Sequence, residues 1–325
     1  MTQPVRVGVL GVGVMGEIHA RNVARTPGAV LAVVCDTDTA RAAELGGELN
    51  ARAVIDPVEL MAAVDAVLIA SSDTTHAELL LTCIGAGKPV LCEKPLAMTL
   101  DDALAVVEAE QRFGRSLIQL GFMREFDPAH AAVRAEVQSG RLGRPVLFRG
   151  THVNPDVAPF RMTAEEAVVR SMIHDLHSTR FMTGCEFIEV LARSVPADDD
   201  PRFTRYVTVS AQLTGNAVAM LDVNMHATYG YEVTAEVVGA DGTARTALPV
   251  AAHVALAAHR SSEVPMHWGK RFAEAYRLEV EAWVASVHAG RVTGPTSADG
   301  IAAQMVADAC CRSLQSGHVE SITVA

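Results

Sequence analysis

The chain has 325 residues, of which 50% are apolar and 20% are charged, and its formal net charge is −11. This length exceeds one ordinary domain of roughly 100–200 residues, so we expect two domains, each with its own core. The acidic charge argues against nucleic acid or an anionic membrane as a partner, and the longest apolar runs fall far short of the roughly 20 residues that span a bilayer.

The six cysteines are scattered and form no Cys-x-x-Cys pair. Such usage is typical of reduced, mostly buried thiols in a cytoplasmic protein. A strand is predicted from residue 5, which leaves no room for a secretory signal before it. We therefore expect a cytoplasmic protein, and we predict no metal site.

Short apolar runs alternate with helical segments in the first third of the chain. Strands are predicted at residues 5–10, 29–35, 64–70, 88–92 and 116–122, and helices at 17–25, 75–86 and 99–113. This alternation is typical of a doubly wound parallel sheet with right-handed crossovers. Residues 1–122 are therefore predicted to form an α/β domain of the Rossmann type.

The pattern changes after residue 122. A helix at 128–140 and a strand at 145–153 precede a helix that starts at a capping box, Thr163–Glu166, and runs to 182. Strands at 186–194, 205–213, 217–225 and 232–240 are predicted to form an antiparallel meander, before helices at 271–289 and 297–316. Residues 123–325 are thus expected to form an α+β domain with an open, mainly antiparallel sheet. Such a sheet commonly packs against another subunit.

The glycine fingerprint Gly11-x-Gly13-x-x-Gly16 follows the first strand and opens a helix. Gly11 permits the tight turn, Gly13 lets the backbone approach a pyrophosphate, and Gly16 allows close packing of helix on strand. Asp36, at the end of the second strand, would accept hydrogen bonds from a ribose diol and repel a 2′-phosphate. The fingerprint therefore predicts NAD rather than NADP, with Asp38 as an alternative ribose ligand.

Two further segments leave strands at the same edge of the predicted sheet. The turn 71–76 should border the nicotinamide ribose, although His76 taken alone is more typical of a packing or capping histidine. Glu93-Lys94-Pro95 follows the next strand, where burial of an ammonium demands partners. The predicted cofactor-binding residues are Gly11, Gly13, Val14, Met15, Gly16, Asp36, Ser71, Ser72, Thr74, His76, Glu93 and Lys94.

The Glu93-Lys94-Pro95 segment resembles that of the Gfo/Idh/MocA oxidoreductases. The likeness spans nearly the whole chain and is greatest to the inositol 2-dehydrogenase branch. Other segments similar to that branch are Gly121–Arg124 with Asp127-Pro128, His152-x-Asn154-Pro155, Ile173–Asp175 with Arg180-Phe181, Tyr229–Glu232, and Arg271-Phe272 with Ala275-Tyr276 and Glu281–Trp283.

The resemblance implies roles for individual residues. Lys94 would bind and polarise the reacting oxygen, and His174 would be the general base that takes the hydroxyl proton, a role that suits a near-neutral pKa. Without the resemblance, His174 reads as a packing histidine on a helix. Family members usually pair through the open sheet, so a homodimer or homotetramer is expected. The residues expected to bind the remaining substrate hydroxyls are Arg124, His152, Asn154 and Tyr231.

Two positions depart from the family pattern. Arg170 stands four residues before His174, where the family usually has an aspartate, and His177 stands where the branch usually has another. If Arg170 faces the pocket with His177, the substrate is predicted to carry a carboxylate or phosphate. If Arg170 instead reaches solvent or pairs with Glu166, a neutral cyclitol is expected.

The sequence thus predicts an NAD-dependent dehydrogenase of a cyclitol, sugar or sugar acid. Another member of the same superfamily, such as a nucleotide-sugar ketoreductase or a dihydrodiol dehydrogenase, is the nearest alternative. A non-catalytic NAD-binding protein is a second, and a glycosidase that recycles bound NAD is a third.

Overall fold

The computed structural model describes residues 3–155, 161–247 and 253–322. The chain forms two compact units, the first of residues 1–123 and 275–302 and the second of residues 124–274 and 303–325. The functional boundary expected between residues 122 and 123 stays a prediction. That predicted division did not include residues 275–302 in the first domain, whereas the structure assigns them to the first unit.

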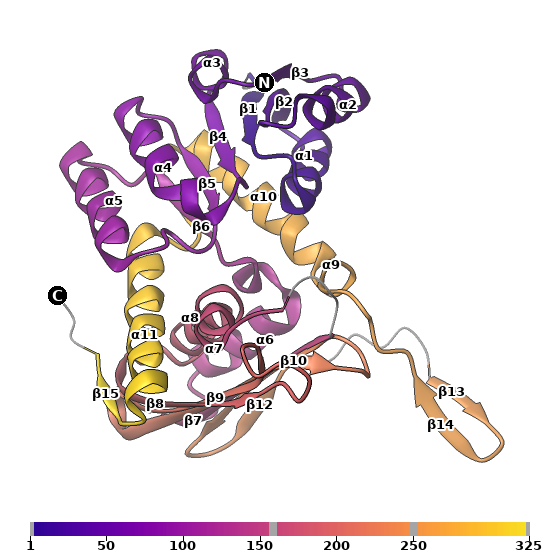
Figure 1. Cartoon of the computed structure of the whole chain (residues 1–325), viewed down its shortest axis with the longest axis vertical. Helices are drawn as coiled ribbons and strands as arrows, with labels where there is room; N and C mark the ends of the chain where they lie inside the picture. The colour runs from indigo at the N-terminus through magenta and orange to yellow at the C-terminus, as the bar shows by residue number, and fades with distance from the viewer. Residues whose placement is uncertain (1–2, 156–160, 248–252, 323–325) are drawn as a thin grey trace. The chain divides into compact units, whose positions relative to one another are not determined.

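A six-stranded parallel sheet forms the centre of the first unit (Figure 1). Its strands are almost wholly apolar because helices cover both faces, and every residue of its fourth strand is buried. In spatial order the strands are β3 (Arg52–Val54), β2 (Ala29–Cys35), β1 (Val5–Leu10), β4 (Ala66–Ile69), β5 (Val90–Glu93) and β6 (Ile118–Gly121). The doubly wound fold predicted for this part is therefore confirmed.

Local signals set the ends of the helices in this unit. Thr99 caps one helix by accepting the Asp102 N–H, and Gly114 ends that helix in the left-handed region. Near the end of the chain, Val280, Trp283 and Val284 pack into the core formed by the sheet. The helices are α1 (Val14–Arg25), α2 (Thr39–Leu49), α3 (Pro57–Ala63), α4 (His76–Gly85), α5 (Leu100–Phe113), α10 (Ala273–Ala289) and α11 (Ser297–Ser316), and the last two begin or end in the second unit.

The strand order places three loops at one edge of the sheet. Chain order reverses between β1 and β4, and ligands of open α/β sheets bind at the carboxyl edge beside such a reversal. The glycine turn follows β1, the turn 71–76 follows β4, and Lys94 follows β5. Because the strands are parallel, all three leave the sheet at that edge.

The second unit is built on a mixed seven-stranded sheet. Five of its neighbouring pairs are antiparallel and the pair β7–β10 is parallel, so the expectation of an open, mainly antiparallel sheet is confirmed. In spatial order the strands are β12 (Thr243–Arg245), β11 (Glu232–Gly239), β7 (Pro145–Pro155), β10 (Ala217–Ala227), β9 (Thr204–Leu213), β8 (Phe187–Pro196) and β15 (Glu320–Ser321).

The predicted simple meander is wrong at one step. β8, β9 and β10 follow one another in antiparallel order, but β11 pairs with β7 instead of β10. β7 therefore lies between β10 and β11. The periodicity of two in each strand gives the buried face but not the neighbour, and β7 is separated from β10 by about sixty residues of chain.

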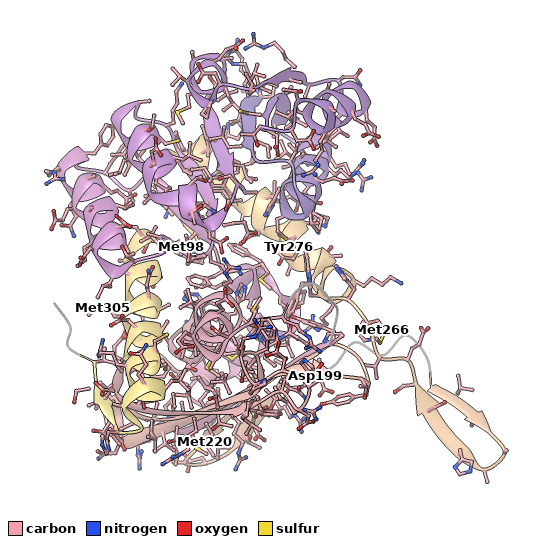
Figure 2. All side chains as sticks on the ribbon, in the orientation of Figure 1. Met98, Asp199, Met220, Met266, Tyr276 and Met305 are labelled. Atoms are coloured by element: carbon pink, nitrogen blue, oxygen red, sulfur yellow. The ribbon has the colours of Figure 1, made fainter. Side chains whose placement is uncertain are left out.

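Helices lie on one face of this sheet (Figure 1), and among the described residues no helix covers the other face, which we call the open face. The helices are α6 (Pro128–Gln138), α7 (Ala164–Ala167), the π-helical turn η3 (Val168–Met172), α8 (Ile173–Thr183) and α9 (Trp268–Arg271). Thr163 and Glu166 form the predicted capping box. On the open face, Met220 of β10 is 52% exposed and points away from α7 and α8 (Figure 2).

A hairpin was not predicted from the sequence. β13 (His253–Leu256) pairs with β14 (His259–Ser262), and neither strand pairs with another sheet. The turn between them, Ala257-Ala258, has positive φ at both residues without a glycine or asparagine to signal it. Over the described ranges, no helix combines the length and apolar character needed to cross a membrane.

Candidate functional site

The glycine loop has the geometry that an anion at a helix N-terminus requires. Gly11 has a φ of +83°, and a Cβ there would come within 2.5 Å of the Ser71 backbone. A Cβ on Gly16 would lie 1.8 Å from the Gly11 carbonyl oxygen, so helix α1 can pack this closely only with glycine. A Cβ on Gly13 would meet no protein atom within 4 Å. The open space at Gly13 fits a pyrophosphate lying on the first turn of α1.

The first residues of α1 are open to a ligand as well. Val14 is largely exposed although it is apolar, and Met15 is half-buried. No side chain caps the N-terminus of α1 at Gly13. The free N–H groups of the first turn are therefore available to a phosphate, which agrees with the predicted role of this loop.

The structure separates the two aspartates considered for the ribose. Asp36 follows β2 directly, and its Oδ2 accepts the backbone N–H of Val12 at 2.7 Å, which fixes it against the glycine loop. Asp38 instead caps helix α2 by accepting the N–H of Arg41. Asp38 thus has a structural task of its own, and Asp36 is the carboxylate that adjoins the loop.

The turn 71–76 is tied to the segment that carries Lys94. His76 is fully buried, and its Nδ1 lies 2.8 Å from the carbonyl oxygen of Pro95. The Ser71 and Thr75 hydroxyls are 2.7 Å apart, and Ser72 and Thr74 are exposed. His76 therefore packs as its residue type suggests, while Ser72 and Thr74 are the exposed residues of the turn.

Glu93, the last residue of β5, is held from two sides. Its Oε1 is 2.8 Å from Nε2 of His19 on α1, and its Oε2 accepts the backbone N–H of Lys94 at 3.3 Å. The Lys94–Pro95 peptide is cis, and Lys94 itself is half-buried. The glycine-loop helix and the lysine segment are thus joined through one carboxylate.

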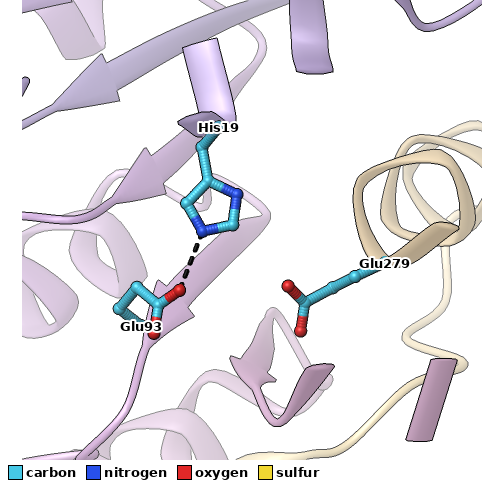
Figure 3. A group of neighbouring side chains, drawn as sticks. All are labelled: His19, Glu93 and Glu279. Carbon is cyan, nitrogen blue, oxygen red and sulfur yellow. Dashed lines mark hydrogen bonds and ion pairs between the residues drawn. The ribbon is translucent and has the colours of Figure 1, made fainter. Parts of the chain in front are cut away.

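A third residue completes this cluster. Glu279 of α10 is fully buried, and atoms of His19, Glu93 and Glu279 able to bind a cation lie within 4.8 Å of one another (Figure 3). The ring of Tyr276, one turn earlier on α10, meets His19 edge-on at 5.7 Å. Glu281, which the sequence comparison singled out on this helix, forms an ion pair with Arg277 at the surface instead.

In the second unit a buried network joins three of the predicted substrate-binding residues. Arg124 is 2% exposed and donates to Asp175 at 2.6 Å, and Nδ1 of His152 lies 3.1 Å from the other Asp175 oxygen. The Tyr231 hydroxyl is 3.3 Å from Nε2 of His152. A tautomer with its proton on Nδ1 lets His152 donate to Asp175 and accept from Tyr231.

The charges of this network balance one another. Desolvation raises the pKa of Asp175, but the charges of Arg124 and His152 and their hydrogen bonds outweigh it, so the pKa is lowered overall. Burial raises the pKa of Tyr231, which therefore stays a neutral phenol. Arg124 is thus one half of a buried ion pair with Asp175 and not an isolated charge.

The remaining candidates lie on α8, η3 and β7. His174 and His177 are buried on α8, and Nε2 of His177 lies 2.8 Å from a Glu125 oxygen. Asn154 of β7 donates to Ser171 at 3.2 Å. Arg170 is half-buried in the π-helical turn that precedes His174, a feature often found at functional sites.

Sequence reasoning gave no role to four residues that the structure connects to the predicted ones. Asp175 stood only within a quoted segment, and Glu125 lay between two quoted segments. His19 lies three residues after Gly16 on the same helix, and Glu279 lies three residues after Tyr276. An acid or histidine on an otherwise apolar helix face was the available signal for both, because burial of such a group demands a partner.

Comparison with known proteins identifies two matching family models. Residues 5–122 match the Gfo/Idh/MocA model described as an oxidoreductase family with an NAD-binding Rossmann fold, and residues 130–245 match the Gfo/Idh/MocA C-terminal domain.

Relatives with known names extend over nearly the full chain. An inositol 2-dehydrogenase of Rubrobacter xylanophilus is 40% identical over 99% of this chain and 94% of its own length. Inositol 2-dehydrogenase 2 of Saccharopolyspora erythraea is 38% identical over 99% and 96%. Among solved structures, myo-inositol dehydrogenase from Lactobacillus casei, in complex with NAD(H) and myo-inositol, is similar with a TM-score of 0.94, 28% identity, and coverage of 99% and 98%.

Proposed function

Because the chain belongs to the Gfo/Idh/MocA family of oxidoreductases, we propose that it is an NAD-dependent dehydrogenase acting on a secondary alcohol of a cyclitol or related sugar. The observation that carries the proposal is the shared edge of the parallel sheet. The glycine loop, the turn 71–76 and Lys94 all leave the sheet there, and the loop fits a dinucleotide. A nicotinamide held at that edge lies on the side of the sheet where Lys94 follows β5.

In this proposal the residues of the chain position the substrate, and the cofactor accepts the hydride. NAD, when bound, supplies the nicotinamide ring that takes hydride from the alcohol carbon. Lys94 binds the reacting oxygen and stabilises the negative charge that develops on it. His174 accepts the hydroxyl proton as general base. Asp36 accepts from the ribose hydroxyls and excludes a 2′-phosphate.

The substrate we propose is neutral. Asp175 neutralises Arg124, and His177 is bonded to Glu125, so neither adds an uncompensated positive charge. The hydroxyl-binding groups are Asn154, His152 and Tyr231, whose amide, imidazole and phenol groups offer donors and acceptors that suit a polyol. An inositol, with a ring of hydroxyls, supplies matching partners.

A substrate and cofactor screen tests this proposal. Purified protein is assayed for reduced-nicotinamide absorbance with myo-inositol, scyllo-inositol, a hexuronate and an inositol phosphate, each with NAD and with NADP. We expect turnover of at least one neutral cyclitol with NAD, and a kcat/KM with NADP lower by on the order of tenfold or more because Asp36 repels the phosphate. If no alcohol gives reduced nicotinamide although NAD binding is measured, the protein is instead a non-catalytic NAD-binding protein.

The same screen run on Arg170→Ala decides the alternative substrate class. For a neutral substrate, the variant keeps or gains cyclitol activity and shows no selective loss with the hexuronate. If the native protein prefers the hexuronate and Arg170→Ala abolishes that preference, Arg170 binds an anionic group and the neutral assignment is wrong.

We also propose that the protein works in the cytoplasm as a homodimer or homotetramer. The six cysteines form no disulfide and five of them are buried, as expected in a reducing compartment. Apolar side chains on the open face of the second sheet support pairing of two copies through that face. They include Val218 and Met220 of β10 and the half-buried Leu191 of β8.

A further inference from the structure

A buried acid–base cluster lies next to Lys94 within the first unit. His19, Glu93 and Glu279 come from α1, β5 and α10 (Figure 3), and they are 1%, 8% and 0% exposed. Their nitrogen and oxygen atoms approach within 4.8 Å of one another, with His19 and Glu93 in direct hydrogen-bond contact. Two carboxylates in so small a buried volume require positive charge nearby.

The cluster is attached to Lys94 through the backbone. Glu93 Oε2 accepts the Lys94 N–H, so the carboxylate fixes the point at which the lysine segment leaves β5. The neighbouring strand leaves room for this arrangement, because a Cβ at Gly121 would lie 3.2 Å from the same Oε2. A larger residue at Gly121 would crowd the carboxylate, so glycine in β6 matches the place of Glu93 in β5.

The charges within the cluster favour the ionised carboxylate. Desolvation raises the pKa of Glu93, but the hydrogen bond from His19 and the charges of His19, Lys94 and His76 outweigh it and leave the pKa lowered. The interaction is reciprocal: a carboxylate stabilised by the Lys94 charge stabilises that charge in turn.

We propose that Glu93, His19 and Glu279 are positioning residues that fix Lys94 at the sheet edge and keep its side chain an ammonium in the nicotinamide site. Glu93 fixes the lysine backbone and supplies a negative charge beside it. His19 fixes Glu93 and ties it to the helix of the glycine loop. Glu279 adds the second negative charge from α10. The inference rests on the proposed function, since it explains how the lysine of that reaction stays protonated.

Among the described residues of the first unit, the titratable groups near Glu93 include His19 of α1, Cys92 of β5, Lys94 itself, His76 of α4 and Glu279 of α10. Asp73 acts on the adjacent Cys92. Burial raises the pKa of Cys92 well above its ordinary value, so it stays a neutral thiol. The two glutamates are the negative charges that the cluster itself contributes beside Lys94.

The experiment compares Glu279→Gln and Glu93→Gln with a matched control, Glu281→Gln, which lies on the same helix in a surface ion pair. Acetylation of Lys94 by a dilute amine-reactive anhydride is followed by mass spectrometry across pH 6 to 11 in the full-length protein. We expect the midpoint of Lys94 reactivity to fall by about one pH unit in each cluster variant and to stay unchanged in the control. NAD affinity and melting temperature are recorded in parallel to show that each variant is folded.

The outcomes separate this inference from the proposed function. If a folded Glu279→Gln protein keeps the native midpoint, the cluster does not hold the charge of Lys94 and the inference is wrong. Should that variant fail to fold, Glu93→Gln decides by the same measurement. A shifted midpoint without turnover of any cyclitol would support the cluster and reject the dehydrogenase. If the protein does turn over a cyclitol, the alkaline limb of its pH profile of kcat/KM must shift together with the midpoint of Lys94 reactivity.

Discussion

At the scale of single residues, the second unit contains charge pairs that are sealed from water. Arg124 with Asp175, and Arg271 with Asp127, are nearly fully buried, and each carboxylate also has a histidine partner. The Arg271 guanidinium lies over the Phe272 ring, 4.4 Å from its centroid. A buried pair of this kind specifies one arrangement of side chains, because separating the partners leaves a charge without compensation.

Replacing Asp175 by Asn tests the importance of that pairing. The amide keeps the shape of the side chain but leaves the Arg124 charge buried without a counterion. We expect the free energy of unfolding to fall by about 3–5 kcal/mol, measured by urea denaturation. Asp308→Asn, which breaks an exposed pair with Arg312, should change it by less than about 1 kcal/mol. Equal effects of the two substitutions would contradict this view of the pair.

The same pair predicts how stability depends on pH. The pKa of Asp175 is lowered in the folded protein, so its contribution is fully present above the unfolded value of roughly 4 and is lost as pH falls through the folded value. The stability gap between native protein and Asp175→Asn should therefore stay constant from pH 7 to 5 and narrow below about pH 4. Denaturation midpoints at four pH values give the gap directly.

At the scale of elements, the glycine loop separates what the fold needs from what the ligand needs. Gly16 is required by the fold, since its Cβ would overlap the Gly11 carbonyl. Gly13 has no such neighbour within the protein, and its φ of −67° is open to any residue. A glycine that the fold does not require indicates that the space beside it is kept for a ligand.

Two alanine substitutions distinguish these roles. Gly13→Ala should leave the free energy of unfolding of the ligand-free protein within about 1 kcal/mol, yet weaken NAD binding by on the order of tenfold because its methyl group occupies the pyrophosphate space. Gly16→Ala should reduce stability by about 1–3 kcal/mol and NAD binding as well. Calorimetric titration with NAD provides the affinities. Unchanged affinity in Gly13→Ala would place the pyrophosphate elsewhere.

Elements were predictable where local sequence decides them. β1, β2 and α11 have the predicted bounds, and the capping box at Thr163 is present, since apolar periodicity and caps are local signals. The parallel pairing of β7 with β10 was missed because it joins segments distant in the chain. Likewise, the partners Asp175 and Glu125 became apparent only from packing. The cofactor residues followed from the glycine fingerprint and the strand ends, the catalytic and substrate-binding residues from the resemblance, and the contacts of both sets only from the fold.

At the scale of the whole molecule, the open face of the second sheet is the surface through which we propose that copies of the chain assemble. Met220, Ser210 and Leu191 lie side by side across β10, β9 and β8. The face also carries polar contacts, such as the Tyr206 hydroxyl donating to Asp222. Such a mixture of apolar and polar groups is usual for contacts between subunits.

A charge on that face tests the proposed assembly. Met220→Lys should lower the mass measured by analytical ultracentrifugation to that of smaller species, because a buried unpaired ammonium at the interface is strongly unfavourable. The substitution lies on an exposed position, so the melting temperature of the monomer should change little. Met266→Lys, at another exposed methionine, is the control. An unaltered mass for Met220→Lys would exclude this face as the interface.

The return of α10 to the first unit has a consequence for biosynthesis. The core of the parallel sheet is completed by Val280, Trp283 and Val284, which the ribosome adds about 160 residues after the end of β6. Until then the nascent amino-terminal portion exposes apolar surface, and its folding is delayed until α10 is synthesised or depends on chaperones. A fragment that ends at residue 123 would lack these core residues of the parallel sheet, so we expect it to aggregate instead of folding as an independent domain.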